Sequence, residues 1–226
     1  MAKTTNIKNK IYISEIFTSH QGEGILIGEL MFFIRLSGCN LSCLWCDTKY
    51  ANKEGKLLYI EEIVNKLKEV EWQKGRWICI TGGEPLMQDN TYLLIKQLLE
   101  LGYSILLETN GSYSIKNLIN IDNLLISMDI KCPSSGEENN NRFSNINLLR
   151  VKDQLKFVIN DERDFYYSQN IINKYNPRCS VIFQPQISYK SPAEFKWLFE
   201  KCKKEKIYAK IILQQHKIVF GEVRGV

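Results

Sequence analysis

MFFIRLSGCNLSCLWC, residues 31–46, joins an apolar run to three closely spaced cysteines. The run from Met31 to Leu36 contains one charged residue, Arg35, and predicts a buried strand. The cysteines follow at once in the spacing C-x3-C-x2-C, as Cys39, Cys43 and Cys46. This stretch therefore predicts a strand that delivers three thiols at its carboxyl end.

The spacing of the cysteines fits a zinc site or a disulfide framework poorly. A structural zinc ion takes four protein ligands, usually in two pairs, but the other cysteines stand singly, at Cys79, Cys132, Cys179 and Cys202. A zinc site that borrows one of these, or one of the two histidines, stays an alternative. A disulfide framework is disfavoured because seven cysteines is an odd number and we find no secretion signal before them.

The three-cysteine motif is better explained by an iron–sulfur cluster with one open iron. An ordinary ferredoxin cluster uses four cysteines. With three thiolates, the fourth iron of a four-iron, four-sulfur cluster is left for an outside ligand. Such an iron can bind the amino and carboxylate groups of S-adenosylmethionine and cleave it reductively to a 5′-deoxyadenosyl radical.

Length and composition indicate one domain over residues 1–226, with room for a sizeable core. Hydrophobic residues make up 44% of the chain and charged residues 24%, and the net charge of +5 is mild. We find no arginine-rich stripe interleaved with aromatic residues, so we expect no direct nucleic-acid binding. No run approaches the roughly 18 apolar residues of a membrane helix, so we expect no membrane partner. Free cysteines without an export signal predict the cytoplasm.

Short apolar strands alternate with amphipathic helices along the chain. Strands are expected at 31–36, 77–80, 104–107, 124–130, 154–159, 181–183 and 207–213, and helices at 60–70, 92–101, 161–175 and 192–206. This βα rhythm is typical of a parallel sheet or barrel. Because the strands are too few for eight-fold closure, we predict an α/β fold with a partial, open β/α barrel. The polar segment Ser134 to Asn147 is expected to be a mobile surface loop.

Polar motifs follow the predicted strands at their carboxyl ends, where chemistry collects in such folds. A glycine turn, Gly82-Gly83-Glu84-Pro85, follows the strand at 77–80. The other motifs after predicted strands are the cysteine loop, Glu108-Thr109-Asn110-Gly111, Asp129 with Lys131, and Gln184-Pro185-Gln186. Each motif is weak alone, but together they predict one site at one edge of the sheet.

The cysteine motif with Thr81-Gly82-Gly83-Glu84-Pro85 resembles the radical S-adenosylmethionine superfamily. Further segments resemble the 7-carboxy-7-deazaguanine synthase family more specifically: 20–24, 33–36, 38–41, 45–48, 129–136 and 215–217. The resemblance covers nearly the whole chain. It implies the radical S-adenosylmethionine type of partial barrel and the ring contraction of 6-carboxy-5,6,7,8-tetrahydropterin to 7-carboxy-7-deazaguanine, with loss of ammonia. The product is a precursor of queuosine or archaeosine in tRNA.

The resemblance also implies cofactors, partners and site residues. The cofactors are a [4Fe–4S] cluster on Cys39, Cys43 and Cys46, S-adenosylmethionine, and Mg2+ on Thr48. The partners are the pterin substrate, a flavodoxin- or ferredoxin-like electron donor, and a second copy in a homodimer. Substrate contacts are expected from His20, Gln21, Gly22, Glu23, Arg35, Thr81, His216 and Val226. Contacts to S-adenosylmethionine are expected from Trp45, Cys46, Asp47, Gly83, Glu84, Glu108, Asp129, Ile130, Lys131 and Gln184.

Side-chain chemistry supports several of these roles. The planar guanidinium of Arg35 suits a substrate carboxylate, although an ion pair within the protein is the alternative. The Thr48 hydroxyl is a hard oxygen ligand of the kind Mg2+ takes. In the family the glycine turn offers backbone groups to the methionine amino group, the Glu84 carboxylate can pair with a cation, and Glu108 stands where a ribose contact is common.

Two other functions share some of these features. A glycyl-radical-enzyme activase would share the cluster and the glycine turn, but it gives no reason for Arg35, Thr48 and the Gln21–Gly24 segment to converge. A non-catalytic iron–sulfur or zinc-binding protein would have no use for the glycine turn and Glu108. Cleavage of S-adenosylmethionine and turnover of the pterin separate these functions.

Overall fold

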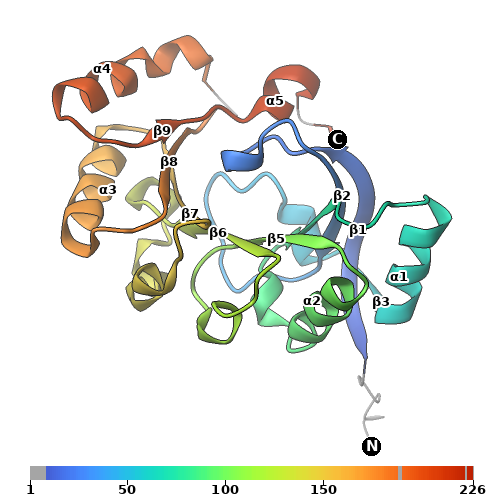
Figure 1. The fold of residues 1–226 in the computed structure, drawn as a ribbon. Helices are drawn as coiled ribbons and strands as arrows, with labels where there is room; N and C mark the ends of the chain where they lie inside the picture. Colours follow the sequence, from blue (N-terminus) through green and yellow to red (C-terminus); the bar gives the residue numbers. More distant parts are fainter. Residues whose placement is uncertain (1–8, 188–189, 222, 226) are drawn as a thin grey trace, which may run out of the picture.

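The computed structural model describes residues 9–187, 190–221 and 223–225. Within these ranges nine strands form one sheet, in the order β3-β1-β2-β4-β5-β6-β7-β8-β9 (Figure 1). The strands are β1 (Lys10–His20), β2 (Leu30–Leu36), β3 (Lys56–Tyr59), β4 (Trp77–Gly82), β5 (Ser104–Thr109), β6 (Leu124–Ile130), β7 (Gln154–Ile159), β8 (Ser180–Pro185) and β9 (Lys210–Ile211). The helices are α1 (Ile60–Glu69), α2 (Thr91–Glu100), α3 (Glu162–Tyr175), α4 (Lys196–Lys204) and α5 (Gln215–Phe220).

The sheet is open and mostly parallel. From β2 to β9 each neighbouring pair is parallel, whereas β1 pairs antiparallel with β2 and with β3 at one edge. Helices α1 to α4 lie around the outside of the curved sheet (Figure 1). The predicted α/β fold with an open, partial barrel is confirmed.

Two strands were not predicted, and two predicted elements differ in their bounds. The sequence reading missed β1 and β3, although Ile11 and Ile13 are buried on either side of exposed Tyr12, as in a half-buried strand. A register shift between Ile13 and Glu15 interrupts this alternation. The last strand covers two residues rather than 207–213, and Tyr208 before it is 96% exposed. The expected helix at 192–206 is a 3-10 turn followed by α4.

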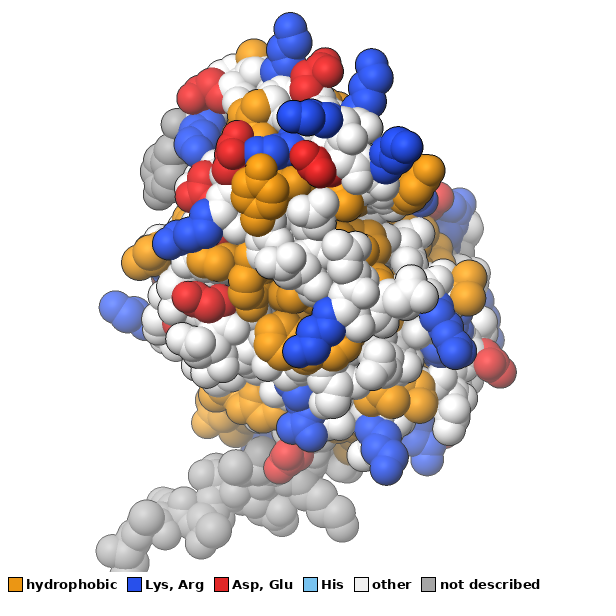
Figure 2. Space-filling model, turned by 90° about the vertical axis from the view of Figure 1, so that its left-hand side faces the viewer, with side chains coloured by type: hydrophobic (Ala, Val, Ile, Leu, Met, Phe, Trp, Pro, Cys, Tyr) orange, Lys and Arg blue, Asp and Glu red, His pale blue; other side chains and the backbone are white. Residues whose placement is uncertain are grey.

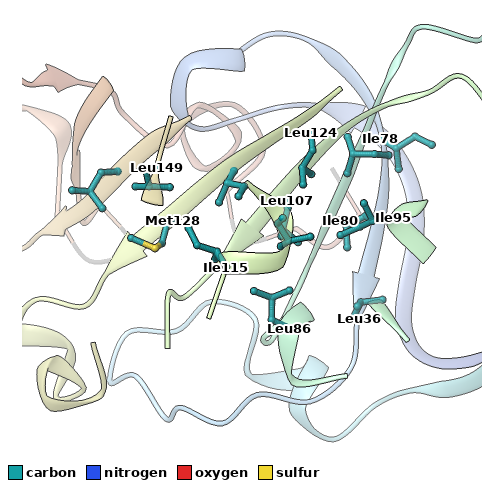
Figure 3. Close-up of a cluster of buried hydrophobic side chains, with 14 of the residues drawn as sticks. Leu36, Ile78, Ile80, Leu86, Ile95, Leu107, Ile115, Leu124, Met128 and Leu149 are labelled. Carbon is teal, nitrogen blue, oxygen red and sulfur yellow. The ribbon is translucent and has the colours of Figure 1, made fainter. Parts of the chain in front are cut away.

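The hydrophobic core lies between the sheet and the helices, on what we call the outer face. Every second strand residue points there, because successive side chains of a strand point to opposite faces. Figure 3 shows this layer, with Ile80, Leu107 and Met128 from three adjacent strands side by side. Helix α1 adds Ile63 and Leu67 from its apolar stripe, both fully buried. The opposite, inner face holds a smaller apolar cluster of Met31, Phe33, Cys79, Leu106 and Leu125 toward the amino ends of the strands, and polar residues toward their carboxyl ends.

The polar segment 134–147, predicted to be a mobile surface loop, contains ordered turns. It forms short 3-10 turns at Pro133–Ser135, Glu138–Asn140 and Phe143–Leu148. Asn145 is fully buried, and its Nδ2 donates to the carbonyl oxygens of Gly111 at 3.0 Å and Tyr113 at 2.7 Å. Asn145 thus ties this segment to the loop that follows β5.

The surface gives two further observations. Among the residues that the structure describes, no helix has both the length and the apolar character needed to cross a bilayer. On the face shown in Figure 2, Lys and Arg side chains are spread singly rather than gathered in a continuous stripe.

Candidate active site

A cavity of about 260 Å³ opens on the inner face of the sheet, at the carboxyl ends of the parallel strands. Strand residues that line it include Arg35 on β2, Thr81 on β4, Glu108 on β5, Asp129 on β6 and Lys156 on β7. Arg35 lies opposite Thr81 in the strand register, and Asp129 lies opposite Lys156. Each of the five directly adjoins a core residue on the outer face, so the pleat of the sheet separates the site from the core.

Cys39, Cys43 and Cys46 all line this cavity as free, partly exposed thiols. The other four cysteines are buried and line no part of it. Within the described ranges no three His, Cys, Asp or Glu side chains are arranged to hold a single metal ion.

The surroundings of the thiols fit such a cluster. Burial raises the pKa of the Cys39 and Cys43 thiols, and a bound metal would stabilise their thiolate forms. The Leu41 backbone N–H donates to Cys39 Sγ at 3.5 Å, and Asn110 Nδ2 lies 3.8 Å from the same sulfur. Hydrogen bonds to cluster sulfurs are one way in which a protein tunes the potential of a cluster.

The glycine turn after β4 packs directly against the start of the cysteine loop. A Cβ added at Gly83 would lie 2.1 Å from the Gly38 carbonyl oxygen and 2.7 Å from Cys39 Cβ, so only glycine fits. The Glu84 backbone N–H donates to the same carbonyl at 2.9 Å. The turn is therefore held beside the cysteine loop, with Gly83 on the wall of the cavity.

The Glu84 carboxylate, which the sequence suggested could pair with a cation, forms no ion pair among the described residues and is turned away from the cavity. Glu84 is fully buried and does not line the cavity. Its oxygens accept from Leu86 N at 2.9 Å, Thr109 Oγ1 at 2.8 Å and Asn110 N at 2.7 Å. This carboxylate ties the glycine turn to the end of β5 and stabilises the wall on which Gly83 and Asn110 lie.

A hydrogen-bonded polar cluster occupies the side of the cavity near the end of β1. Gln21 Nε2 donates to Glu108 Oε1 at 3.1 Å, and Thr81 Oγ1 donates to Glu108 Oε2 at 2.8 Å. The Glu23 backbone N–H donates to Gln21 Oε1 at 3.1 Å. Glu108, predicted to contact the ribose, thus sits among residues predicted to contact the substrate.

Next to this cluster runs a chain of buried charges. Lys156 Nζ lies 2.5 Å from Glu23 Oε2 and 3.4 Å from Asp129 Oδ1, and Lys131 Nζ lies 2.9 Å from Asp129 Oδ2. Burial raises the pKa of Glu23, but Lys156 and His216 outweigh it and hold the pKa of this carboxyl well below its usual range. Burial lowers the pKa of Lys131, but Asp129 outweighs it and raises that pKa. Both lysines therefore stay cationic at neutral pH.

Arg35 lines the cavity and is also paired within the protein. Its Nε donates to Glu15 Oε2 at 2.9 Å, and the Tyr50 hydroxyl donates to the same oxygen at 2.9 Å. The guanidinium carries four more N–H donors on its two Nη atoms. Glu15 thus orients the fork, and the predicted substrate role and the structural ion pair are compatible.

The C-terminal segment also lines the cavity, with His216 and Lys217 of α5. Lys217 Nζ pairs with Asp47 Oδ2 at 2.9 Å, beside Thr48. The Gln215 backbone N–H donates to the Gly22 carbonyl oxygen at 2.9 Å. A Cβ at Gly22 would lie 2.2 Å from His216 Nδ1, so glycine permits this close approach. Helix α5 thereby brings His216 against the Gln21–Glu23 segment.

The chain matches the Radical SAM superfamily over residues 33–148. It is 36% identical to the 7-carboxy-7-deazaguanine synthase of Thermoplasma acidophilum, over 95% of this chain and 99% of that one. It is 35% identical to that of Clostridium acetobutylicum, over 95% and 98%. The chain belongs to the 7-carboxy-7-deazaguanine synthase family. The crystal structure of QueE from Escherichia coli has the same fold, with a TM-score of 0.74 and 21% identity over 95% of this chain and 100% of that one.

Most positions that the family resemblance had implied converge on the cavity. On the substrate side His20, Gln21, Gly22, Glu23, Arg35, Thr81 and His216 line it, and Val226 lies outside the described residues. On the cofactor side Trp45, Cys46, Asp47, Thr48, Gly83, Glu108, Asp129, Lys131 and Gln184 line it. Ile130, like Glu84, does not line the cavity, because its side chain is 2% exposed and packs in the core. The contacts with ligands stay predictions.

Sequence reasoning missed three side chains at the site, Glu15, Lys156 and Gln214, and it named Gln186 only as part of a motif, without a ligand. Lys156 carried a usable signal, because it is a lone charge in the apolar run 154–159, just as Arg35 is in β2. Gln186 lines the cavity beside Gln184, and both are almost fully buried. Gln186 Nε2 and Gln184 Oε1 have no hydrogen-bond partner among the described residues. Buried polar atoms without partners at a cavity wall fit a bound polar ligand.

Proposed function

We propose that this enzyme contracts the ring of 6-carboxy-5,6,7,8-tetrahydropterin in the cavity and forms 7-carboxy-7-deazaguanine with loss of ammonia. The chain is a radical S-adenosylmethionine enzyme of the 7-carboxy-7-deazaguanine synthase family. One observation carries the proposal beyond the family name: the cysteine loop shares its cavity with Arg35 and with the Gln21–Glu23–Glu108 cluster. This shared cavity supports a site for a radical source next to a site for a polar heterocyclic acid.

Members of the superfamily use a [4Fe–4S] cluster and S-adenosylmethionine. Cys39, Cys43 and Cys46 would hold the cluster. When bound, the two groups together supply a 5′-deoxyadenosyl radical that takes a hydrogen atom from C6 of the pterin. We assign S-adenosylmethionine to the part of the cavity wall formed by the Gly83 backbone, Asp129, Lys131 and Gln184. Gln184 Oε1 has no hydrogen-bond partner among the described residues and could accept one from this cofactor.

The chain's own residues would bind and orient the substrate. The Nη groups of Arg35 would hold the substrate carboxylate as a bidentate pair, with Glu15 fixing the plane of the guanidinium. Gln21 would donate and accept hydrogen bonds at the edge of the pterin, and ionised Glu23 would accept them. Helix α5, with His216, would exclude water from the reacting carbon and so protect a radical from side reactions.

Mg2+ is part of the same proposal, with the Thr48 hydroxyl as its protein ligand. Thr48 lines the cavity, and its Oγ1 donates to Asp47 Oδ1 at 2.8 Å. Mg2+ keeps several waters and needs few protein oxygens when a substrate supplies others. The ion would then fix the substrate carboxylate relative to the cysteine loop.

An electron donor and a second copy of the chain complete the proposal. Leu44, between two of the cysteines, is 69% exposed and offers an apolar contact beside the cysteine loop for a flavodoxin- or ferredoxin-like protein. A homodimer is supported by the exposed apolar side chains of the C-terminal segment, which could be buried against a second copy: Ile218, Val219, Phe220 and Val223. We expect the enzyme to act in the cytoplasm on the queuosine or archaeosine route.

The proposed function is tested by anaerobic reconstitution with iron and sulfide, followed by incubation with reductant, S-adenosylmethionine, Mg2+ and the pterin. We expect 7-carboxy-7-deazaguanine, formed only when all components are present. Cleavage of S-adenosylmethionine without pterin turnover would point to an activase, and absence of cleavage to a non-catalytic iron–sulfur protein. Either result would overturn the proposal.

A further inference from the structure

Lys156 is a buried cation that no role described so far requires. It lies in the middle of β7, is 5% exposed, and lines the cavity. The strand register sets it opposite Asp129, so both side chains lie on the inner face. Burying an ammonium is costly unless it is paired. Its partners are Glu23 Oε2 at 2.5 Å and Asp129 Oδ1 at 3.4 Å.

These two partners belong to different halves of the site. Glu23 follows β1 next to Gln21, in the cluster that faces the substrate. Asp129 is the second-last residue of β6 and pairs with Lys131, on the wall assigned to S-adenosylmethionine. One ammonium therefore spans the boundary between the substrate side and the cofactor side of the cavity.

The charge of Glu23 depends mainly on this lysine. Burial alone would raise the pKa of Glu23, and Lys156 is the largest of the influences that lower it. Gln214 Nε2 also donates to Glu23 Oε1, at 2.8 Å. The titratable groups that face Glu23 from the elements around it are Lys156, His216, Asp47, Glu108, Asp129 and Cys79. Lys156 is the only one of these in direct contact with its carboxylate.

We propose that Lys156 is a positioning residue: its ammonium, anchored on Asp129, keeps Glu23 as an ionised, fixed acceptor for the N–H groups of the pterin edge. The inference rests on the proposed function, because it takes Glu23 to face the pterin. Lys156 acts through Glu23 rather than as a proton donor. Burial lowers the pKa of Lys156, but Asp129, Glu23 and Glu108 outweigh it and hold that pKa well above its usual range.

The test is the affinity of 6-carboxytetrahydropterin for cluster-loaded enzyme with S-adenosylmethionine, measured by equilibrium binding between pH 6 and pH 9. The wild type gives a nearly flat profile, because its Glu23 is ionised throughout. In Lys156→Met the carboxylate is left buried without its cation, so binding weakens by roughly tenfold per pH unit as pH falls below the raised pKa of Glu23. Lys156→Arg restores a flat profile. Lys156→Gln gives the same slope of pterin affinity against pH as Lys156→Met, and it replaces that variant in the test if Lys156→Met folds poorly.

Two controls separate this role from a structural one. In Glu23→Gln/Lys156→Met an amide replaces the titrating carboxylate, so binding is weak but flat in pH. Lys201→Met removes a lysine that pairs with Glu162, between α4 and α3 and away from the cavity. Its pterin affinity depends on pH as that of the wild type does. Because Asp129 retains Lys131, the affinity for S-adenosylmethionine in Lys156→Met stays within about threefold of the wild type.

The outcomes distinguish the inference from the proposed function. A flat profile in Lys156→Met, or an unchanged slope after Glu23→Gln is added, overturns the role of Lys156 while the proposed function stands. A wild type that fails to bind the pterin overturns both.

Discussion

The two faces of the central sheet are built from the same strands but serve different purposes. On the outer face Ile80, Leu107 and Met128 are fully buried under helices. One residue further along the same strands, Thr81, Glu108 and Asp129 line the cavity on the inner face. The step of one residue turns a side chain from the core to the site, because the side-chain period of a strand is two.

This difference teaches where stability and chemistry reside. The outer face buries apolar surface, which stabilises the fold. The inner face holds Arg35, Lys131, Lys156 and several carboxylates, whose burial is costly and is offset only by pairing. Substitutions on the outer face should therefore lower the free energy of unfolding, and those on the inner face should lower ligand binding or turnover. The following predictions use that contrast.

The largest effect is expected at the cysteine loop. Replacing Cys39, Cys43 or Cys46 by Ala removes a cluster ligand and should abolish reductive cleavage of S-adenosylmethionine, with little change in the thermal melting of the apoprotein. The measurement is 5′-deoxyadenosine formation by reconstituted enzyme. Cys79→Ala, Cys132→Ala, Cys179→Ala and Cys202→Ala should keep this activity. A requirement for any of these four in cluster assembly contradicts the open-iron arrangement.

Arg35 should show the next largest effect, in substrate binding. Loss of a charge-assisted bidentate pair in a dry site costs about 2–5 kcal/mol, so pterin affinity in Arg35→Ala should fall by that amount. Arg35→Lys should fail nearly as badly, because a point charge lacks the fork geometry. Glu15→Gln keeps the guanidinium but holds it less firmly in place, so the loss of pterin affinity in this variant should be smaller. Unchanged pterin binding in Arg35→Ala would give Arg35 a purely structural role with Glu15.

Adjacent residues of β5 offer the sharpest test of the contrast between the faces. Leu107→Ala leaves a cavity in the core and should lower the free energy of unfolding by about 2–5 kcal/mol, while the folded protein keeps its pterin affinity. Glu108→Gln should change the unfolding free energy by much less and weaken pterin binding instead. Denaturant unfolding and ligand binding are measured on both variants. The same loss of stability in both would show that the faces are not separated in this way.

The smallest effect is expected at Thr48. Thr48→Ala removes one oxygen from an ion that keeps other ligands, so the Mg2+ concentration for half-maximal turnover should rise by roughly tenfold, about 1.4 kcal/mol. Thr48→Ser keeps the oxygen and should respond nearly as the wild type does. Product formation is followed against Mg2+ concentration. An unchanged Mg2+ response in Thr48→Ala would mean that Thr48 is not a ligand.

Sequence reasoning located most of the sheet because β2 and β4 to β8 are continuous apolar runs. It failed at β1, where polar residues and a register shift break the alternation near Ile13 and Glu15. That failure hid the antiparallel edge, and with it the position of Glu15 beside Arg35.

The site was predictable where chemistry follows the end of a strand, and unpredictable where partners meet only in the fold. The cysteine loop, Thr81 and Asp129 lie near the ends of their strands. Lys156 and Glu23 are 133 residues apart, and no local pattern joins them. The orientation of Glu84 was unpredictable for a related reason: the sequence does not show whether a carboxylate after a turn faces the cavity or the turn itself.

The most direct test of the central claim, that radical source and pterin meet on the inner face, is the fate of the hydrogen at C6. Reconstituted enzyme is given 6-carboxytetrahydropterin deuterated at C6, and the deuterium content of S-adenosylmethionine and 5′-deoxyadenosine is measured by mass spectrometry. The account predicts that deuterium appears in these nucleosides as 7-carboxy-7-deazaguanine forms, and that Arg35→Ala lowers this transfer. Product formation with no deuterium in either nucleoside would contradict it.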